Sequence, residues 1–174
     1  MKILKLTLVL VAFIAFTSCS EDDNGGGNDT SGDIVGTWIG AGVDYTGTSE
    51  TTTMGQTVSA DFVGEAFDIN YTLTFSENPN NVVADGSYSI ELTTTINGQS
   101  STETVEDLEF LNDGTWERSG NTLTITAEGE PGDATIVELT DTTLVLEIVE
   151  SEGISAPDFE FTTQVTAVMT FTRQ

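Results

Sequence analysis

The chain has 174 residues, with 29 Asp and Glu against 4 Lys and Arg, no His and a formal net charge of -25. A chain of this length suffices for one domain with a single core. The charge argues against nucleic-acid binding, in which Lys and Arg neutralise phosphates. Without His there is no Ser-His-Asp triad and no His-ligated zinc or iron site.

The first residues have the pattern of a lipoprotein signal peptide. Lys2 and Lys5 precede an apolar run over residues 6–16, which is too short for a permanent membrane span of about 20 residues. Phe16-Thr17-Ser18-Cys19 then resembles a bacterial lipobox, in which the signal peptide is cut before a cysteine that carries lipid. We therefore expect residues 1–18 to be removed and Cys19 to be the lipidation site that anchors the protein to a membrane. As the only cysteine, Cys19 has no disulfide partner within the chain.

Residues 19–33 are predicted to form a flexible tether, because they combine glycines with like charges that repel one another. This stretch also resembles the acidic segment that, in lipoproteins of Bacteroidetes-type bacteria, directs export to the outer face of the outer membrane. The resemblance implies a lipid-anchored protein of the outer membrane that is exposed at the cell surface. An EF-hand calcium loop is not indicated, because the Glu at its twelfth position and the flanking helices are missing.

Residues 34–174 predict one all-β domain, because they are rich in threonine and alternate apolar with polar side chains. Turn residues such as Asn97-Gly98 separate the alternating segments at short intervals. The expected strands cover residues 34–45, 51–62, 65–76, 86–96, 99–105, 114–119, 121–128, 133–140, 142–150 and 159–173. About 8–10 sequential antiparallel strands favour a single up-and-down barrel over a sandwich. Residues 45–63 and 150–158 are long and polar, so they are expected to be mouth loops or an extra hairpin.

Several short sequence segments resemble those of a lipocalin-like domain found in lipoproteins of Bacteroidetes-type bacteria. Gly36-Thr37-Trp38 is similar to the start of a lipocalin-type barrel. The segments similar to its hairpins and closing strand are Leu111-Asn112-Asp113-Gly114-Thr115, Gly120-Asn121-Thr122-Leu123-Thr124-Ile125, Leu139-Thr140-Asp141-Thr142-Thr143-Leu144-Val145-Leu146 and Met169-Thr170-Phe171-Thr172-Arg173. The resemblance implies that Gly36, Trp38 and Arg173 close one end of the barrel, with the arginine packed over the tryptophan ring.

A barrel of about eight strands encloses side chains or one small ligand. The apolar strand faces supply the candidate lining residues: Phe67, Ile69, Tyr71, Leu73, Phe75, Tyr88, Ile90, Leu92, Leu146, Phe161, Val165 and Met169. The same side chains could instead fill the barrel as a core. Trp116 is interpreted either as a half-buried hairpin residue or as a platform for a sugar.

The leading functional hypothesis is a non-enzymatic binder of a small apolar or amphipathic ligand, with no cofactor and no resident metal. The alternative is a surface interaction protein with a filled barrel, whose acidic loops bind a partner protein, a glycan or calcium. Those loops contain Glu103, Glu106, Asp107 and Glu109, and Glu150, Glu152, Asp158 and Glu160. A solvated acidic surface that keeps the protein soluble explains the same residues. Accidental carboxylate pairs are expected at this composition, so no hydrolase site can be assigned.

Overall fold

The structure is a computed structural model that describes residues 28–174, in which every regular element is a β-strand. The expected signal peptide, Cys19 and the first part of the tether lie outside the described residues. The strands are β1 (Gly36–Thr53), β2 (Gln56–Ser76), β3 (Asn81–Ile96), β4 (Gln99–Leu108), β5 (Gly114–Ser119), β6 (Thr122–Ala127), β7 (Glu130–Leu139), β8 (Thr143–Ala156) and β9 (Phe159–Arg173). Between residues 28 and 174, no helix is long and apolar enough to cross a membrane.

The strands form an antiparallel sheet that closes on itself. The strand order is β2-β1-β9-β8-β7-β6-β5-β3-β4, and an additional pairing of β2 with β3 completes the ring. β4 lies outside this ring, because it pairs with the later part of β3. β5 joins β3 through only two residue pairs, Asn81 with Thr115 and Val82 with Gly114. The predicted single up-and-down barrel is confirmed.

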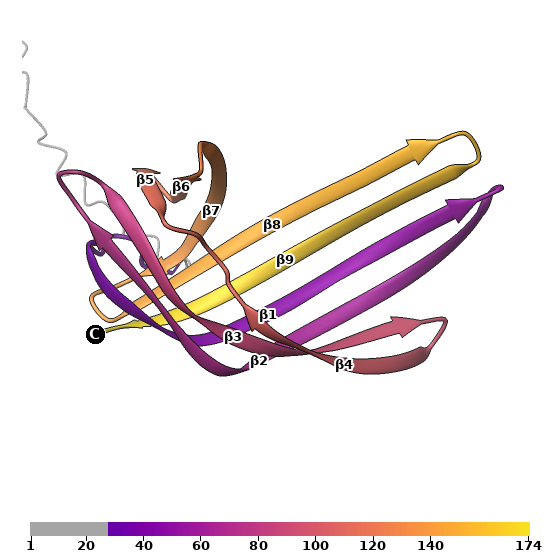
Figure 1. The fold of residues 1–174 in the computed structure, drawn as a ribbon, viewed down its shortest axis with the longest axis horizontal. Coiled ribbons are helices and arrows are strands. Elements are labelled where there is room, and N and C mark those ends of the chain that lie inside the picture. The colour runs from indigo at the N-terminus through magenta and orange to yellow at the C-terminus, as the bar shows by residue number, and fades with distance from the viewer. Residues whose placement is uncertain (1–27) are drawn as a thin grey trace, which may run out of the picture.

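The barrel wall is much taller on one side than on the other (Figure 1). The short wall consists of β5, β6 and β7, which have 6, 6 and 10 residues. In the tall wall, β1 has 18 residues and β2 has 21. We call the barrel end at the β6–β7 turn the mouth. Residues 46–63, 93–104 and 149–166 continue past it as a projecting sheet with strand order β4-β3-β2-β1-β9-β8.

The projecting sheet corrects the predicted bounds of the first two strands and decides between the two alternatives for residues 45–63 and 150–158. Residues 34–45 and 51–62 were expected in separate strands, yet β1 runs without a break to Thr53 and β2 starts at Gln56. The turn between them uses Met54 and Gly55, whose φ angles of 50° and 75° are left-handed, as a tight hairpin needs. Residues 150–158 likewise extend β8 into a hairpin with β9. Both segments form hairpins that extend the barrel strands, so the hairpin alternative holds and the mouth-loop alternative does not.

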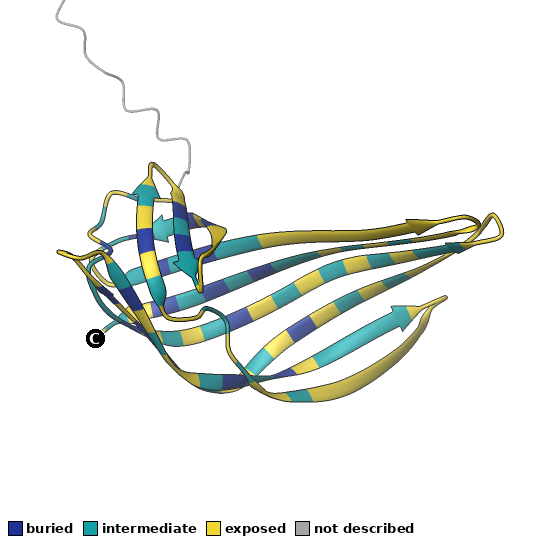
Figure 2. Ribbon diagram, turned by 45° about the horizontal axis from the view of Figure 1, so that its top comes forward, coloured by how far each residue is buried: buried dark blue, intermediate teal, exposed yellow. Residues whose placement is uncertain are grey.

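The hydrophobic core lies inside the barrel, below the mouth. Trp38, Leu73, Leu144, Leu146 and Phe171 are fully buried there. The burial of each such side chain stabilises the fold by about 1.5–3 kcal/mol. In Figure 2 the buried residues gather where the short and tall walls face each other, and the far half of the projecting sheet is mostly exposed. The core therefore exists where two walls cover it.

Candidate functional site

The structure places most of the predicted lining residues in the packed interior of the barrel. They belong to one buried cluster and comprise Tyr71, Leu73, Phe75, Tyr88, Ile90, Leu146 and Met169. Tyr71 packs edge-on against Tyr88, with ring centroids 6.4 Å apart and an interplanar angle of 79°. Side chains thus fill the barrel between its closed end and these tyrosines, which directs attention to the mouth.

Phe67 does not lie on the inner face that its alternation predicted. Asp68 has a left-handed φ of 49°, and the register between β2 and β3 shifts between Phe67 and Asn70. This bulge inserts one residue, so the side chains before it change face. Phe67 is therefore 37% exposed on the outer face, whereas Ile69 packs against the core.

The remaining candidates lie higher on the tall wall. Leu92 is partly buried and packs against the core. Val165 and Phe161 are partly buried on β9, and Val165 lines a cavity at the mouth. The structure therefore separates the predicted lining set into a core group, a mouth group, Phe161 on the projecting sheet and the outward-facing Phe67.

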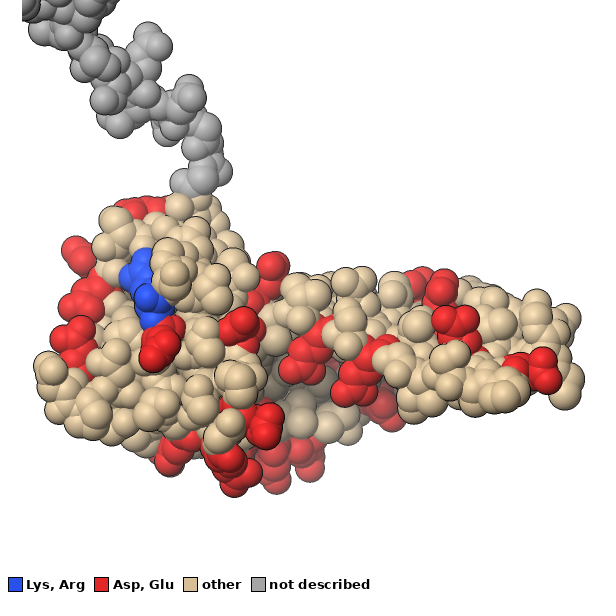
Figure 3. All heavy atoms as spheres, turned by 90° about the horizontal axis from the view of Figure 1, so that it is seen from above, with Lys and Arg blue, Asp and Glu red and all other residues tan. Residues whose placement is uncertain are grey.

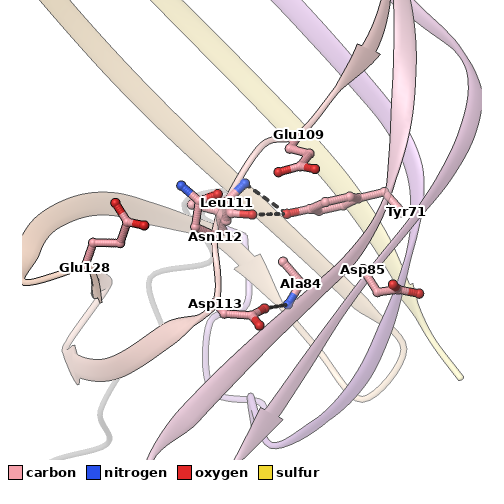
Figure 4. Close-up of a pocket in the computed structure, with 9 residues that line it drawn as sticks. Tyr71, Ala84, Asp85, Glu109, Leu111, Asn112, Asp113 and Glu128 are labelled. Atoms are coloured by element: carbon pink, nitrogen blue, oxygen red, sulfur yellow. Dashed lines mark hydrogen bonds between the residues drawn. The ribbon is translucent and has the colours of Figure 1, made fainter.

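The mouth is crossed by a strap, residues 109–113, which connects β4 to β5. The Tyr71 hydroxyl accepts a hydrogen bond from the Leu111 N–H at 2.9 Å and donates one to the Leu111 carbonyl at 2.8 Å (Figure 4). At the end of the strap, Asp113 Oδ1 accepts a hydrogen bond from the Ala84 N–H at 2.8 Å. A single partly buried hydroxyl thus satisfies both backbone groups of Leu111 and holds the strap across the barrel.

Three cavities surround this strap. The largest, about 550 Å³, lies between the strap and the β6–β7 hairpin, and Phe110, Ile125 and Ile148 supply apolar lining. A second cavity of about 150 Å³ shares Phe110, Ile148 and Glu150 with it and reaches Tyr45 and Val165. The third, about 520 Å³, lies on the other side of the strap and is rich in carboxylates. Its lining residues are Tyr71, Ala84, Asp85, Gly86, Glu109, Leu111, Asn112, Asp113 and Glu128.

All three tyrosines of the chain meet below the mouth. The Tyr45 and Tyr88 hydroxyls hydrogen-bond to each other. Burial raises the pKa of Tyr71 to about 12, and burial is also the largest cause that raises the pKa of Tyr88 and Tyr45. These phenols stay neutral at physiological pH, so they act as hydrogen-bonding groups and not as bases.

The opposite end of the barrel is closed by Trp38. The Arg173 guanidinium carbon lies 4.2 Å from the centre of the Trp38 ring, which is the arrangement that the sequence resemblance implied. Trp38 also donates a hydrogen bond from its indole nitrogen to the Ile34 carbonyl at 2.8 Å. An added Cβ at Gly36 would lie 2.7 Å from the arginine Nη1, and Gly36 has a φ of 138°, so this position requires glycine.

Both described arginines hold the segment that enters the barrel. Arg173 donates to the carbonyls of Val35 and Asp33, and Arg118 donates to those of Gly32 and Thr30. Residues 30–35 are thereby fixed across the closed end. Both arginines lie at the end opposite the mouth, so all charged side chains that residues 28–174 place at the mouth are negative.

A profile of the lipocalin-like domain matches residues 34–146. The chain belongs to the lipocalin-like domain family. The matched region includes the Trp38 end, the strap and the short wall, and it ends within β8. No curated protein and no solved structure matches the chain.

The structure also places the remaining candidate residues of this lipocalin-like barrel. Trp116 is only 6% exposed, packs edge-on against Phe75 and donates to the Ser76 carbonyl at 3.0 Å. It is a core residue and not a platform for a sugar. Within residues 28–174, no three carboxylates lie close enough together to hold a metal ion.

Sequence reasoning missed several residues of the mouth. Tyr45, Phe110 and Ile148 were not among the predicted lining residues, although each contributes to the cavities. The apolar pair Phe110-Leu111 within an acidic stretch was the available signal, because two large apolar residues between strands suggest a buried connection. Tyr45 continues the inner-face alternation that Val43 starts, and the same pattern could have included it.

Proposed function

We propose that this lipocalin-like barrel is a lipid-anchored outer-membrane protein that binds one small apolar or amphipathic ligand at its mouth. The observation that carries the proposal is the pair of adjoining cavities of about 550 and 150 Å³ beneath and beside the strap. Small-molecule sites typically measure about 300–1,000 Å³ and combine apolar walls with a few polar groups. Binding proteins are the usual members of the lipocalin-like family, which agrees with this role.

The lining of the larger cavity favours an amphipathic ligand. Phe110, Ile125 and Ile148 provide an apolar surface, while carboxylates lie at its border. The acidic lining residues are Glu128, Glu130, Asp133 and Glu150. A ligand with an apolar body and a neutral or positively charged head would therefore be accommodated, whereas an anionic head would be repelled.

Native mass spectrometry of the protein purified from its source membrane tests the binding proposal. We expect a noncovalent small-molecule adduct that is lost in the variant Ala127→Phe, whose new ring fills the mouth cavity. The control is Ala156→Phe, which adds the same ring at an exposed position of β8. Recovery of bare protein alone, with no rise in its melting temperature when lipid extract is added, would remove the support for a carried ligand.

The anchoring part of the proposal is supported by the sequence before residue 20. The positively charged start, the apolar run and the lipobox-like Phe16-Thr17-Ser18-Cys19 all favour lipidation, and the acidic residues that follow favour export to the cell surface. The fold agrees with this placement, because residues 30–35 enter the barrel at the end opposite the mouth. We expect Cys19→Ala to move the protein into the soluble fraction, and continued membrane association would contradict lipidation at Cys19.

A further inference from the structure

The projecting sheet has an apolar face that no other segment of residues 28–174 covers. Directly paired residues of neighbouring strands share a face, so Thr51 places Val58 of β2 and Phe161 of β9 on the same side. Phe161 in turn pairs with Ile154 of β8. Ile154 is 63% exposed and Val58 is 49% exposed. This inner face is continuous with the barrel interior, because Val43 and Met169 lie on it further down the same strands.

Further apolar side chains extend this face between the tip and the mouth. Gly47 pairs with Phe62 and with Val165, which puts both on the inner face, and an added Cβ at Gly47 would collide with the Phe62 ring. Ala60 pairs with Ile96, which is 42% exposed. Apolar residues therefore lie on β8, β9, β2 and β3 of this face, on both sides of the small and polar inner-face residues of β1.

The outer face of the projecting sheet has a different composition. Threonine and serine hydroxyls form hydrogen bonds across the strands there. The Oγ1 atoms of Thr52 and Thr57 are 2.7 Å apart, and those of Thr93 and Thr102 are 2.8 Å apart. Val63 and Val149 are the exposed large apolar residues on this side. The sheet is amphipathic, and its apolar side is the one left open. Contiguous exposed apolar surface of this kind marks an interaction site in soluble proteins.

The negative charge of the projecting sheet decides which kind of molecule fits its inner face. Glu103 of β4 and Glu152 of β8 lie on the inner face at the two edges of the projecting sheet, because they pair with Leu92 and Thr163. The projecting sheet carries no Lys or Arg, and Figure 3 shows the blue cation surface on the compact part and only red charges along the projection. A second copy would bring the same negative charge, and an anionic lipid surface would be repelled in the same way. A partner with an apolar side and positive charges fits both properties.

We propose that the inner face of the projecting sheet docks a basic amphipathic helix of a partner protein or peptide. Its apolar side would pack on Val58, Ile154 and Phe161, and its Lys or Arg residues would face Glu103 and Glu152. Five inter-strand spacings of about 4.8 Å put the two edges of the projecting sheet about 24 Å apart, so a helix of about 16 residues at 1.5 Å each that lies across the strands reaches both carboxylates. This site differs from the mouth cavity and accepts a different class of ligand.

The test uses a defined helical peptide and the full chain with Cys19→Ala as a common background, so that no lipid or detergent competes for the apolar face. The probe is a fluorescently labelled 18-residue peptide of Leu and Lys with the two residue types on opposite helical faces. A peptide with Glu in place of Lys and a scrambled Leu/Lys peptide of the same composition are the controls. We expect binding of the first peptide at micromolar concentrations, at least tenfold weaker binding of both controls, and weakening as salt is raised.

Matched variants locate the binding surface. The double variant Val58→Thr and Ile154→Thr keeps β-branched side chains but removes apolar surface from the inner face, and we expect at least tenfold weaker binding. Glu103→Gln with Glu152→Gln should weaken binding and reduce its salt dependence. The control Val63→Thr with Val149→Thr makes the same kind of change on the outer face and should leave the affinity unchanged. Circular dichroism and melting temperature confirm that each variant is folded.

Several results would overturn the proposal. They are no binding of the Leu/Lys peptide, equal binding of its Glu counterpart, equal losses in the inner-face and outer-face variants, or a stable dimer in analytical ultracentrifugation that the inner-face variant abolishes. The mouth variant Ala127→Phe keeps this test separate from the small-ligand proposal, because it should leave peptide affinity unchanged.

Discussion

The barrel below the mouth and the projecting sheet share the strands of the tall wall. The same strand face is buried in the barrel and exposed in the projecting sheet. On β8, Leu146 is fully buried, whereas Ile154 on the same face is 63% exposed. The difference is that the short wall covers the first and ends before it reaches the second. An apolar strand face therefore becomes a core only where a second wall stands opposite it, and where none does it is a surface available to another molecule.

The largest expected difference between the two regions is in the cost of removing an aromatic ring. Phe171 and Phe159 occupy the same face of β9, but Phe171 is fully buried and Phe159 is 39% exposed. We expect Phe171→Ala to lower the free energy of unfolding by about 3–5 kcal/mol, because it leaves a cavity in the core. Phe159→Ala should cost less than about 1 kcal/mol. Urea denaturation of both variants measures the two values, and similar losses would contradict the comparison.

Alkaline pH should destabilise the barrel through its tyrosines. The pKa of Tyr71 is raised to about 12 by burial, so the folded protein keeps a proton that the unfolded chain loses near pH 10. This stabilisation is complete below pH 10 and is lost as the pH rises from about 10 to 12, at up to about 1.4 kcal/mol per pH unit for one buried tyrosine. Solvent screening of partly exposed hydroxyls reduces that figure.

Absorbance of the phenolate and urea denaturation between pH 9 and 12 check this behaviour. We expect the tyrosines to ionise only as the protein unfolds. A titration near pH 10 with the fold intact would show that the three hydroxyls are accessible to water.

The variant Tyr71→Phe should lower the free energy of unfolding by a smaller amount. It keeps the ring in the core and removes the hydroxyl that hydrogen-bonds to Leu111. We expect a loss of about 1–3 kcal/mol, because the Leu111 N–H and carbonyl lose their partner. Hydrogen exchange should become faster in residues 109–113 than elsewhere. The control Tyr45→Phe removes the hydroxyl bonded to Tyr88 without touching the strap. Unchanged exchange in the strap of Tyr71→Phe would show that other contacts hold it.

The fold was largely predictable because its signals are local. The alternation of apolar and polar residues marks the inner faces of the strands, and turn residues such as Asn97-Gly98 mark hairpins. The segment Gly36-Thr37-Trp38 indicated the closed end of the barrel, which Arg173 covers. Errors arose where a local signal was weak. Asp68 and Met54 adopt left-handed φ angles although neither is glycine, so the bulge had no clear mark in the sequence and the β1–β2 turn was marked only by Gly55.

The candidate site was much less predictable, because it depends on contacts between distant segments. The strap meets Tyr71 across 40 residues of sequence, and no periodicity encodes that contact. Alternation also gave Leu146 and Phe161 the same assignment, although one lies in the core and the other on the projecting sheet. Which stretch of a strand lies opposite the short wall is decided by the lengths of β5, β6 and β7, and these are properties of the assembled barrel.

Hydrogen–deuterium exchange along β9 tests this division of one strand into two regions most directly. Residues 167–172 lie in the covered barrel and residues 160–165 in the projecting sheet, and both stretches have paired neighbours on each side. We predict that the amides of 167–172 exchange only by global unfolding, at least about 100-fold more slowly than those of 160–165, which exchange by local opening. Equal protection along the whole strand in the isolated protein would contradict the account, because it would mean that the projecting face is covered.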